Sequence, residues 1–206
     1  MTRDEMASGE ATVDAPATAS ANTEGEASTV LAQPKKTLKG GRLIGPLEPP
    51  RLWSRHILNC ALVAPLLRPG RVGDIGSGAG LPGLVLAIAR PDVDLVLIEP
   101  MERRCDWLRE QTELLNLTNV EVVRARAEDA MVEPLDQVTA RAVTALRTLI
   151  PVSVALLRAG GELVLMKGRR VEEERIAAAK AIAKAKLVDV EILELGIGVV
   201  DETTMV

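Results

Sequence analysis

An aspartate followed by alternating glycines carries the clearest chemical signal in the chain: Asp74-Ile75-Gly76-Ser77-Gly78-Ala79-Gly80. A short apolar run precedes this segment and a helical pattern follows it, so it predicts a turn between a strand and a helix. Glycine lets the backbone adopt positive φ and approach a ligand closely. A carboxylate at the end of a strand suits a ligand with a cationic group. The segment therefore predicts a binding site for a small molecule.

The dinucleotide pattern G-x-G-x-x-G fits this turn poorly. Gly78-x-Gly80-x-x-Gly83 matches it, but the strand must then continue through Gly76, and Pro82 must lie inside the phosphate turn. In the frame that starts at Gly76, the third glycine position holds Leu81. Neither frame suits a pyrophosphate.

The other pattern, D-x-G-x-G-x-G, resembles motif I of the S-adenosylmethionine methyltransferases. Asp74 suits the ammonium group of that cofactor, and Glu99, after the next apolar run, can accept hydrogen bonds from both ribose hydroxyls. An acid about 20 residues downstream also occurs in dinucleotide folds, so Asp74 is the residue that discriminates. Ser77, Gly78 and Gly80 then belong to the cofactor-binding turn.

The hydrophobic period alternates along the chain between the helical and the strand type. It predicts helices over 52–67, 81–90, 102–115, 146–157 and 172–184, and strands over 72–75, 93–98, 120–124, 137–141, 161–166 and 187–195. This alternation predicts an α/β fold, a Rossmann-like parallel sheet with helices on both faces, as in class I S-adenosylmethionine methyltransferases.

The acidity of the chain is concentrated at its start. The first 30 residues hold six acids and one base and show no periodic apolar pattern, which is typical of disorder. We expect residues 1–38 to form a disordered acidic tail and linker, and residues 39–206 to form the methyltransferase domain. The remaining chain is close to neutral, which neither requires nor excludes a polyanionic partner.

Composition excludes several classes of protein. No apolar run reaches the roughly 18 residues of a membrane span, which excludes an integral membrane protein. Cys60 and Cys105 lie far apart, which excludes a disulfide scaffold and suits a reducing cytosol. Trp53 and Trp107 are the only aromatic rings besides the single histidine, His56, so a platform of stacked aromatics for bases is excluded. We expect all five side chains to pack.

Further segments occur in a fixed order around motif I. They are R-L-W-S-R-H-I-L-N at 51–59, D-I-G-S-G-A-G-L-P-G at 74–83, R-A-R-A-E at 124–128, A-R-A at 140–142 and L-M-K-G at 165–168. Together they make the chain resemble the bacterial 16S rRNA guanine-N7 methyltransferases, the glucose-inhibited division protein B family, from about residue 42 onward. Motif I is common to many methyltransferases, and the L-P-G extension and the other segments are the specific part.

The resemblance implies a cofactor, a substrate and a set of site residues. The cofactor is S-adenosyl-L-methionine, and the partner is 16S rRNA or the 30S ribosomal subunit. The protein would act as a cytoplasmic monomer, without a metal ion or a membrane. The implied cofactor contacts are Gly76, Leu81, Ala127, Glu128 and Arg141, and the residues that would face RNA are Arg103, Arg126 and Lys167.

The implied chemistry needs no general base. Guanine N7 carries an in-plane lone pair and no proton, so it can attack a sulfonium methyl directly. The enzyme has to align nitrogen, methyl and sulfur and to exclude water. We expect Arg141 and Lys167 to position the reactants.

The chain departs from the family pattern in three places. The acidic tail replaces a longer helical region, Val143 replaces an aromatic residue after A-R-A, and the family's last strand continues past Thr203–Val206. That strand is expected to insert between the two strands before it, so its shortening leaves ladder edges unpaired. We therefore expect a truncated last strand.

Other functions stay open from the sequence alone. The same fold serves small-molecule methyltransferases, and a non-catalytic RNA-binding relative would fit a shortened last strand. An NAD-dependent oxidoreductase is a more distant alternative. Lys167 follows a strand at the edge where open sheets bind ligands, whereas Arg103, Arg104 and Arg109 on one helix also fit a solvated face.

Overall fold

The computed structural model describes residues 52–206. The predicted tail and linker, residues 1–38, and the first part of the predicted domain, residues 39–51, lie outside the described residues. No helix within residues 52–206 is long and apolar enough to cross a membrane.

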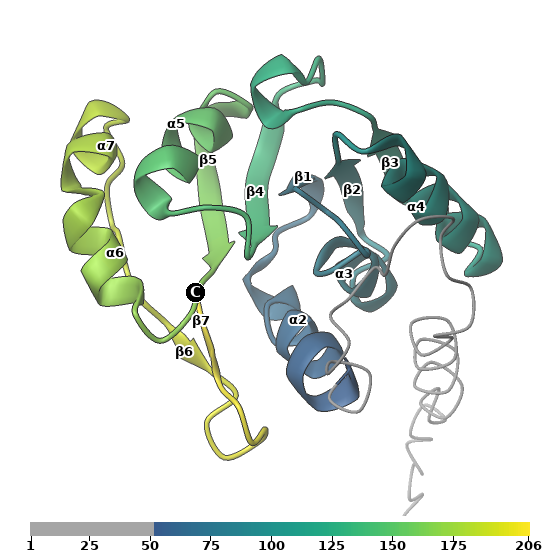
Figure 1. The fold of residues 1–206 in the computed structure, drawn as a ribbon, viewed down its shortest axis with the longest axis horizontal. Helices are drawn as coiled ribbons and strands as arrows, with labels where there is room; N and C mark the ends of the chain where they lie inside the picture. Colours follow the sequence, from purple (N-terminus) through teal and green to yellow (C-terminus); the bar gives the residue numbers. More distant parts are fainter. Residues whose placement is uncertain (1–51) are drawn as a thin grey trace, which may run out of the picture.

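A sheet of five parallel strands forms the centre of the molecule (Figure 1). Its strands are β1 (Gly70–Ile75), β2 (Val93–Ile98), β3 (Val120–Val123), β4 (Leu135–Arg141) and β5 (Leu157–Met166). Their order, β3-β2-β1-β4-β5, confirms the parallel sheet, although β1, β4 and β5 begin a few residues earlier than predicted. The chain moves outward from β1 to β3 and then crosses back to β4, so its direction reverses between β1 and β4.

Helices cover both faces of this sheet, as predicted. They are α3 (Gly83–Ala89), α4 (Glu102–Leu114), α5 (Leu146–Val154), α6 (Val171–Ala177) and α7 (Ala179–Lys184). Alternate residues of β2 explain the two layers: Leu95 and Leu97 pack in the core with α3 and α4, and Val96 and Ile98 pack in the core with α5. Residue 178 separates α6 from α7, which divides the predicted helix over 172–184.

The predicted helix over 52–67 forms as three short pieces. They are a π-helix η2 (Leu52–Leu58), a short α-helix α2 (Asn59–Ala61) and a 3-10 helix η3 (Ala64–Leu66). Pro65 lies in η3 and lacks the N–H that an α-helical bond requires, so the α-helical pattern stops there. His56 and Asn59 are buried, because this segment packs against the sheet.

The predicted strand over 187–195 is wrong for most of its length. Only β6 (Glu194–Leu195) forms a ladder, antiparallel to β7 (Thr204–Met205). Lys186 and Asp189 adopt φ values of 54° and 52°, which interrupt the extended path that the alternating residues suggested.

The last strand is short and lies where the sequence predicted it. The Lys167 amide donates to the Met205 carbonyl oxygen at 2.8 Å, so β7 lies between the end of β5 and β6. Within residues 52–206, the rest of the outer edge of β5 has no ladder partner.

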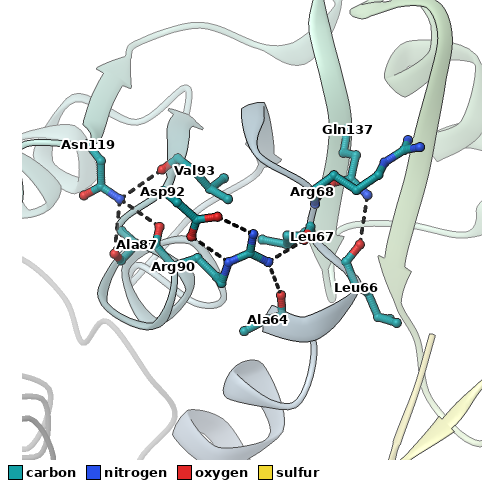
Figure 2. A network of polar contacts seen from close by, with 10 residues as sticks. All are labelled: Ala64, Leu66, Leu67, Arg68, Ala87, Arg90, Asp92, Val93, Asn119 and Gln137. Carbon is teal, nitrogen blue, oxygen red and sulfur yellow. Dashed lines mark hydrogen bonds and ion pairs between the residues drawn. The ribbon is translucent and has the colours of Figure 1, made fainter. Parts of the chain in front are cut away.

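A polar network joins the loops at the amino ends of the strands (Figure 2). The Asn119 side-chain amide donates at 2.9–3.2 Å to the carbonyl oxygens of Ala87, Arg90 and Val93. The Arg90 guanidinium pairs with Asp92 and donates to the carbonyl oxygens of Ala64 and Leu67. These bonds tie η3 and the end of α3 to the starts of β2 and β3.

Gln137 extends the same network to β4. Its side-chain nitrogen donates to the Leu66 carbonyl oxygen at 3.0 Å, and its side-chain oxygen accepts from the Arg68 amide at 2.7 Å. Gln137 is fully buried, and these bonds satisfy both ends of its amide. The chain that enters β1 is thereby fixed to the neighbouring strand β4.

Candidate functional site

The predicted site residues gather at the carboxyl ends of the strands. Asp74 lies near the end of β1, Glu99 directly follows β2, and Arg141 ends β4. Lys167 directly follows β5, and because the strands are parallel these positions share the edge toward which β4 and β5 point in Figure 1. Open α/β sheets bind ligands at such an edge, in the crevice where the chain direction reverses.

The glycine turn between β1 and α3 is hydrogen-bonded to the end of β2. Gly76, Gly78 and Gly80 have φ values of 70°, 56° and 90°, which favour glycine. A Cβ atom at Gly80 would lie 2.3 Å from Leu84 Cδ1, so this glycine is required for packing. A Cβ atom at Gly78 would meet only the Gly76 carbonyl oxygen, at 3.6 Å. The backbone at Gly78 is therefore open to a ligand.

Two predicted residues of this turn have structural partners. The buried Ser77 hydroxyl donates to the Asp74 carbonyl oxygen at 2.8 Å, which holds the turn against β1. Leu81 is partly buried against the core that contains α3. Both side chains support the shape of the turn, and a ligand would meet its backbone.

Asp74 is fully buried beneath the turn, with one carboxylate oxygen satisfied. Its Oδ2 atom accepts from the Gly83 amide at 3.0 Å, whereas Oδ1 has no partner. Burial raises the pKa of Asp74 to about 7, against the lowering effects of its hydrogen bonds and of Arg141. A buried acceptor without a donor fits a cationic ligand group that would supply one.

Glu99 is held more rigidly than Asp74. Its Oε2 atom accepts from the Gly78 amide and its Oε1 atom from the Met101 amide, both at 3.0 Å. Arg104 Nη1 lies 3.6 Å from Oε2. Each carboxylate oxygen keeps lone pairs for further donors, so the fixed side chain can accept hydrogen bonds from two hydroxyls.

Arg141 is held by the helical start of the described chain, which the sequence did not predict. Its Nη1 atom donates to Cys60 Sγ at 3.4 Å, and its Nη2 atom contacts His56 Nδ1. Burial raises the pKa of Cys60 to about 11, although Arg141 opposes this, so the thiol is neutral at physiological pH. His56 and Cys60 stand one helical turn apart, and that spacing was the available signal.

A cavity of about 500 Å³ opens beside Arg141. The ends of β4 and β5 line it, together with η2, α2 and β7, which surround that edge in Figure 1. Its polar lining is mainly basic, with acids between the bases: Arg55, Arg141, Lys167, Arg169, Glu174 and Glu202. The cavity can therefore hold a polar or anionic group beside Arg141.

Lys167 lines this cavity with an ammonium group that is already engaged. Its Nζ atom lies 2.8 Å from Glu174 Oε2 and donates to the Thr144 carbonyl oxygen at 2.9 Å. Its side chain is 9% exposed. Lys167 therefore fixes α6 to the loop after β4.

The other predicted site residues lie farther out along the same edge. The Arg126 side chain is 72% exposed, and its Nη1 atom is 4.0 Å from Glu128 Oε1. Ala127 is partly buried against the hydrophobic core that contains α5, and Arg103 is exposed on α4. In the part of the chain that the structure describes, no three His, Cys, Asp or Glu side chains are arranged to hold a metal ion.

Comparison with known proteins also indicates a methyltransferase. The family model GidB, described as rRNA small subunit methyltransferase G, matches residues 34–202. A protein from Leifsonia xyli subsp. xyli is 68% identical over 165 residues, 80% of this chain and 79% of that protein. A protein from Corynebacterium glutamicum is 49% identical over 166 residues, 78% of this chain and 74% of that protein. Both are named ribosomal RNA small subunit methyltransferase G.

Solved structures support the fold. The chain is similar to a fibrillarin from Aeropyrum pernix in complex with S-adenosyl-L-methionine, with a TM-score of 0.56 and 18% identity over 74% of each chain. It is also similar to an S-adenosylmethionine-dependent methyltransferase from Aquifex aeolicus, with a TM-score of 0.53 and 18% identity. That match covers 76% of this chain and 90% of the other.

Proposed function

The chain belongs to the rRNA small subunit methyltransferase G family, and from this membership we propose that it methylates N7 of a guanine in 16S rRNA. It is an S-adenosylmethionine-dependent methyltransferase with a Rossmann-like class I fold. When bound, the cofactor supplies a methyl group on a positively charged sulfur. The fold alone would also serve a small-molecule enzyme, but relatives named for ribosomal RNA favour an RNA acceptor.

The unpartnered Oδ1 atom of Asp74, beneath an open glycine turn, is the observation that supports the cofactor assignment most directly. An ammonium group would supply the donor that this oxygen lacks. Glu99, at the end of β2, would accept from the two ribose hydroxyls. Ala127 and Glu128, in the 3-10 turn after β3, would flank the adenine. We propose that these residues hold the cofactor in an extended path across the ends of β1, β2 and β3.

Arg141 would stand between the cofactor and the acceptor. It is close enough to Asp74 to oppose the rise of that carboxyl's pKa, and it also lines the cavity of about 500 Å³. A guanidinium at this position can donate to guanine O6 and leave N7 free for the methyl group. We propose that Arg141 and Lys167 position the reactants and that neither removes a proton, because N7 has none to lose.

The RNA would approach along the basic rim of the same edge. Arg126 and Arg103 are exposed there, and their charges suit phosphates. We propose that 16S rRNA, free or in the 30S subunit, is bound across this rim by a monomer. A ribosomal substrate puts the reaction in the cytoplasm.

Methyl transfer from radiolabelled S-adenosylmethionine to undermethylated 16S rRNA or 30S subunits tests this proposal. We expect one labelled guanine, which borohydride reduction and aniline cleavage would locate as N7-methylguanine. Gly78→Val is the matched control, because a side chain at positive φ closes the backbone to the cofactor. Label on another atom, or on small molecules but not RNA, would overturn the proposal.

A further inference from the structure

Asn59 is a buried amide that the cofactor site leaves unused. It is 7% exposed, its Oδ1 atom has no hydrogen-bond partner, and its residue lines the cavity of about 500 Å³ beside Arg141. A buried acceptor without a donor is costly, which indicates that a ligand completes it.

The cavity offers the surroundings that a single purine base requires. Ala142 and Met205 supply apolar surface, and Met166 is 3% exposed at the end of β5. An unstacked base in an enzyme site is commonly held between aromatic or apolar side chains, and these residues supply the apolar kind. Its volume exceeds that of a base, which leaves space for the ribose.

The reaction determines the orientation of guanine in the cavity. N7 and O6 share one edge of guanine, and this edge must face the methyl group and Arg141. The opposite edge then carries the N1–H group and the 2-amino group, both donors. Asn59, on α2, lines the cavity from the side of the helical start. Its carbonyl oxygen can accept a hydrogen bond from the 2-amino group.

We propose that this cavity binds the target guanine and that Asn59 selects it by accepting from the 2-amino group. The proposal rests on the proposed function, since it concerns the acceptor of that reaction. Asn59 is then a specificity-determining residue. It contacts the base but takes no part in the methyl transfer itself. Adenine lacks a 2-amino group, so the same contact disfavours it.

An RNA with inosine in place of the target guanine tests this contact, because inosine lacks only the 2-amino group. We expect the wild-type protein to methylate the guanine RNA with a kcat/KM about tenfold higher, the effect of one hydrogen bond to a buried acceptor. Asn59→Leu should bring this ratio close to one. Asn59→Asp, which keeps the acceptor, should retain the preference. Asn59→Ser shortens the side chain and replaces the leucine variant if that variant does not fold.

Ser153→Ala is the matched control. Ser153 is also fully buried with an unpartnered oxygen, but it lies on α5 and away from this cavity, so its loss should leave the ratio unchanged. Equal wild-type rates for both RNAs, or an unchanged ratio in Asn59→Leu and Asn59→Ser, would overturn the assignment of Asn59 and leave the proposed function intact. Absence of methyl transfer to either RNA would overturn both.

Discussion

Several buried polar side chains at the two ends of the sheet differ in how they are hydrogen-bonded. At the amino end, the side-chain amides of Asn119 and Gln137 and the guanidinium of Arg90 find acceptors within the chain (Figure 2). At the carboxyl end, the Oδ1 atoms of Asp74 and Asn59 are buried without a partner. A satisfied network stabilises one arrangement, whereas an unsatisfied acceptor is a cost that a ligand can remove. We therefore propose that a ligand removes this cost at Asp74 and at Asn59.

The electrostatics follow the same division. Asp136, near the start of β4, has a lowered pKa, chiefly because the Arg71 amide donates to its carboxylate. Asp74, near the end of β1, has a raised pKa because it is buried. One carboxylate favours the folded state when ionised, and the other opposes it.

The largest effect should come from breaking the amino-end network with Arg90→Leu. The substitution leaves the carbonyl oxygens of Ala64 and Leu67 without their donor, and we expect a loss of about 3 kcal/mol in the free energy of unfolding. Urea denaturation would measure it. Arg109→Leu, which removes an exposed pair with Asp106, should cost less than about 0.5 kcal/mol. A tenfold loss of cofactor affinity in Arg90→Leu would contradict the separation of the two ends.

The next effect should come from Asp74→Asn, at the opposite end. We expect cofactor affinity to fall at least about tenfold, or 1.4 kcal/mol, because an amide cannot pair with an ammonium group as a carboxylate does. Calorimetric titration would measure this loss. Stability at pH 8 should not fall, since the substitution removes a buried charge. Unchanged affinity would remove Asp74 from the cofactor site.

The same substitution should change how stability depends on pH. Between pH 4 and 7 the unfolded chain ionises Asp74 while the folded protein holds its proton, so this residue lowers stability progressively as pH rises to about 7. Above pH 7 the contribution is constant. Asp74→Asn should remove this fall in urea titrations of the ligand-free protein, and Asp136→Asn should leave it in place. An identical pH profile for Asp74→Asn and wild type would contradict the raised pKa.

The smallest effect should distinguish two cations within the carboxyl end. Arg126→Ala should lower the salt slope of RNA binding by about one unit, without changing stability, because its side chain is exposed. Lys167→Met should change the slope less and lower stability, because its ammonium already pairs with Glu174. Filter binding at several salt concentrations, with melting temperatures, would measure both. A larger change of the salt slope in Lys167→Met than in Arg126→Ala would make Lys167 the phosphate contact.

The sequence predicted the positions of Asp74 and Glu99 better than the surroundings of Arg141. Asp74 and Glu99 follow strands whose apolar runs are unmistakable, and parallel strands bring such ends together whatever else the fold does. The contacts of Arg141 with His56 and Cys60 join residues 81 to 85 positions apart, and no local period encodes them. The prediction of a strand over 187–195 was wrong for most of its length. Alternation of apolar and polar residues suggests an extended chain, but a strand also needs a neighbouring strand to pair with.

The outer edge of β5 bears on how this protein behaves in concentrated solution. Within residues 52–206 its ladder pairing stops at Lys167, and such a row of free amides and carbonyls is a template for another chain. Arg158 and Glu162 place charges along it, and Gly160, at a φ of 75°, bends it. Charge and curvature are both features that disfavour pairing of one strand edge with another, and a buffer that screens charge should weaken the first of them.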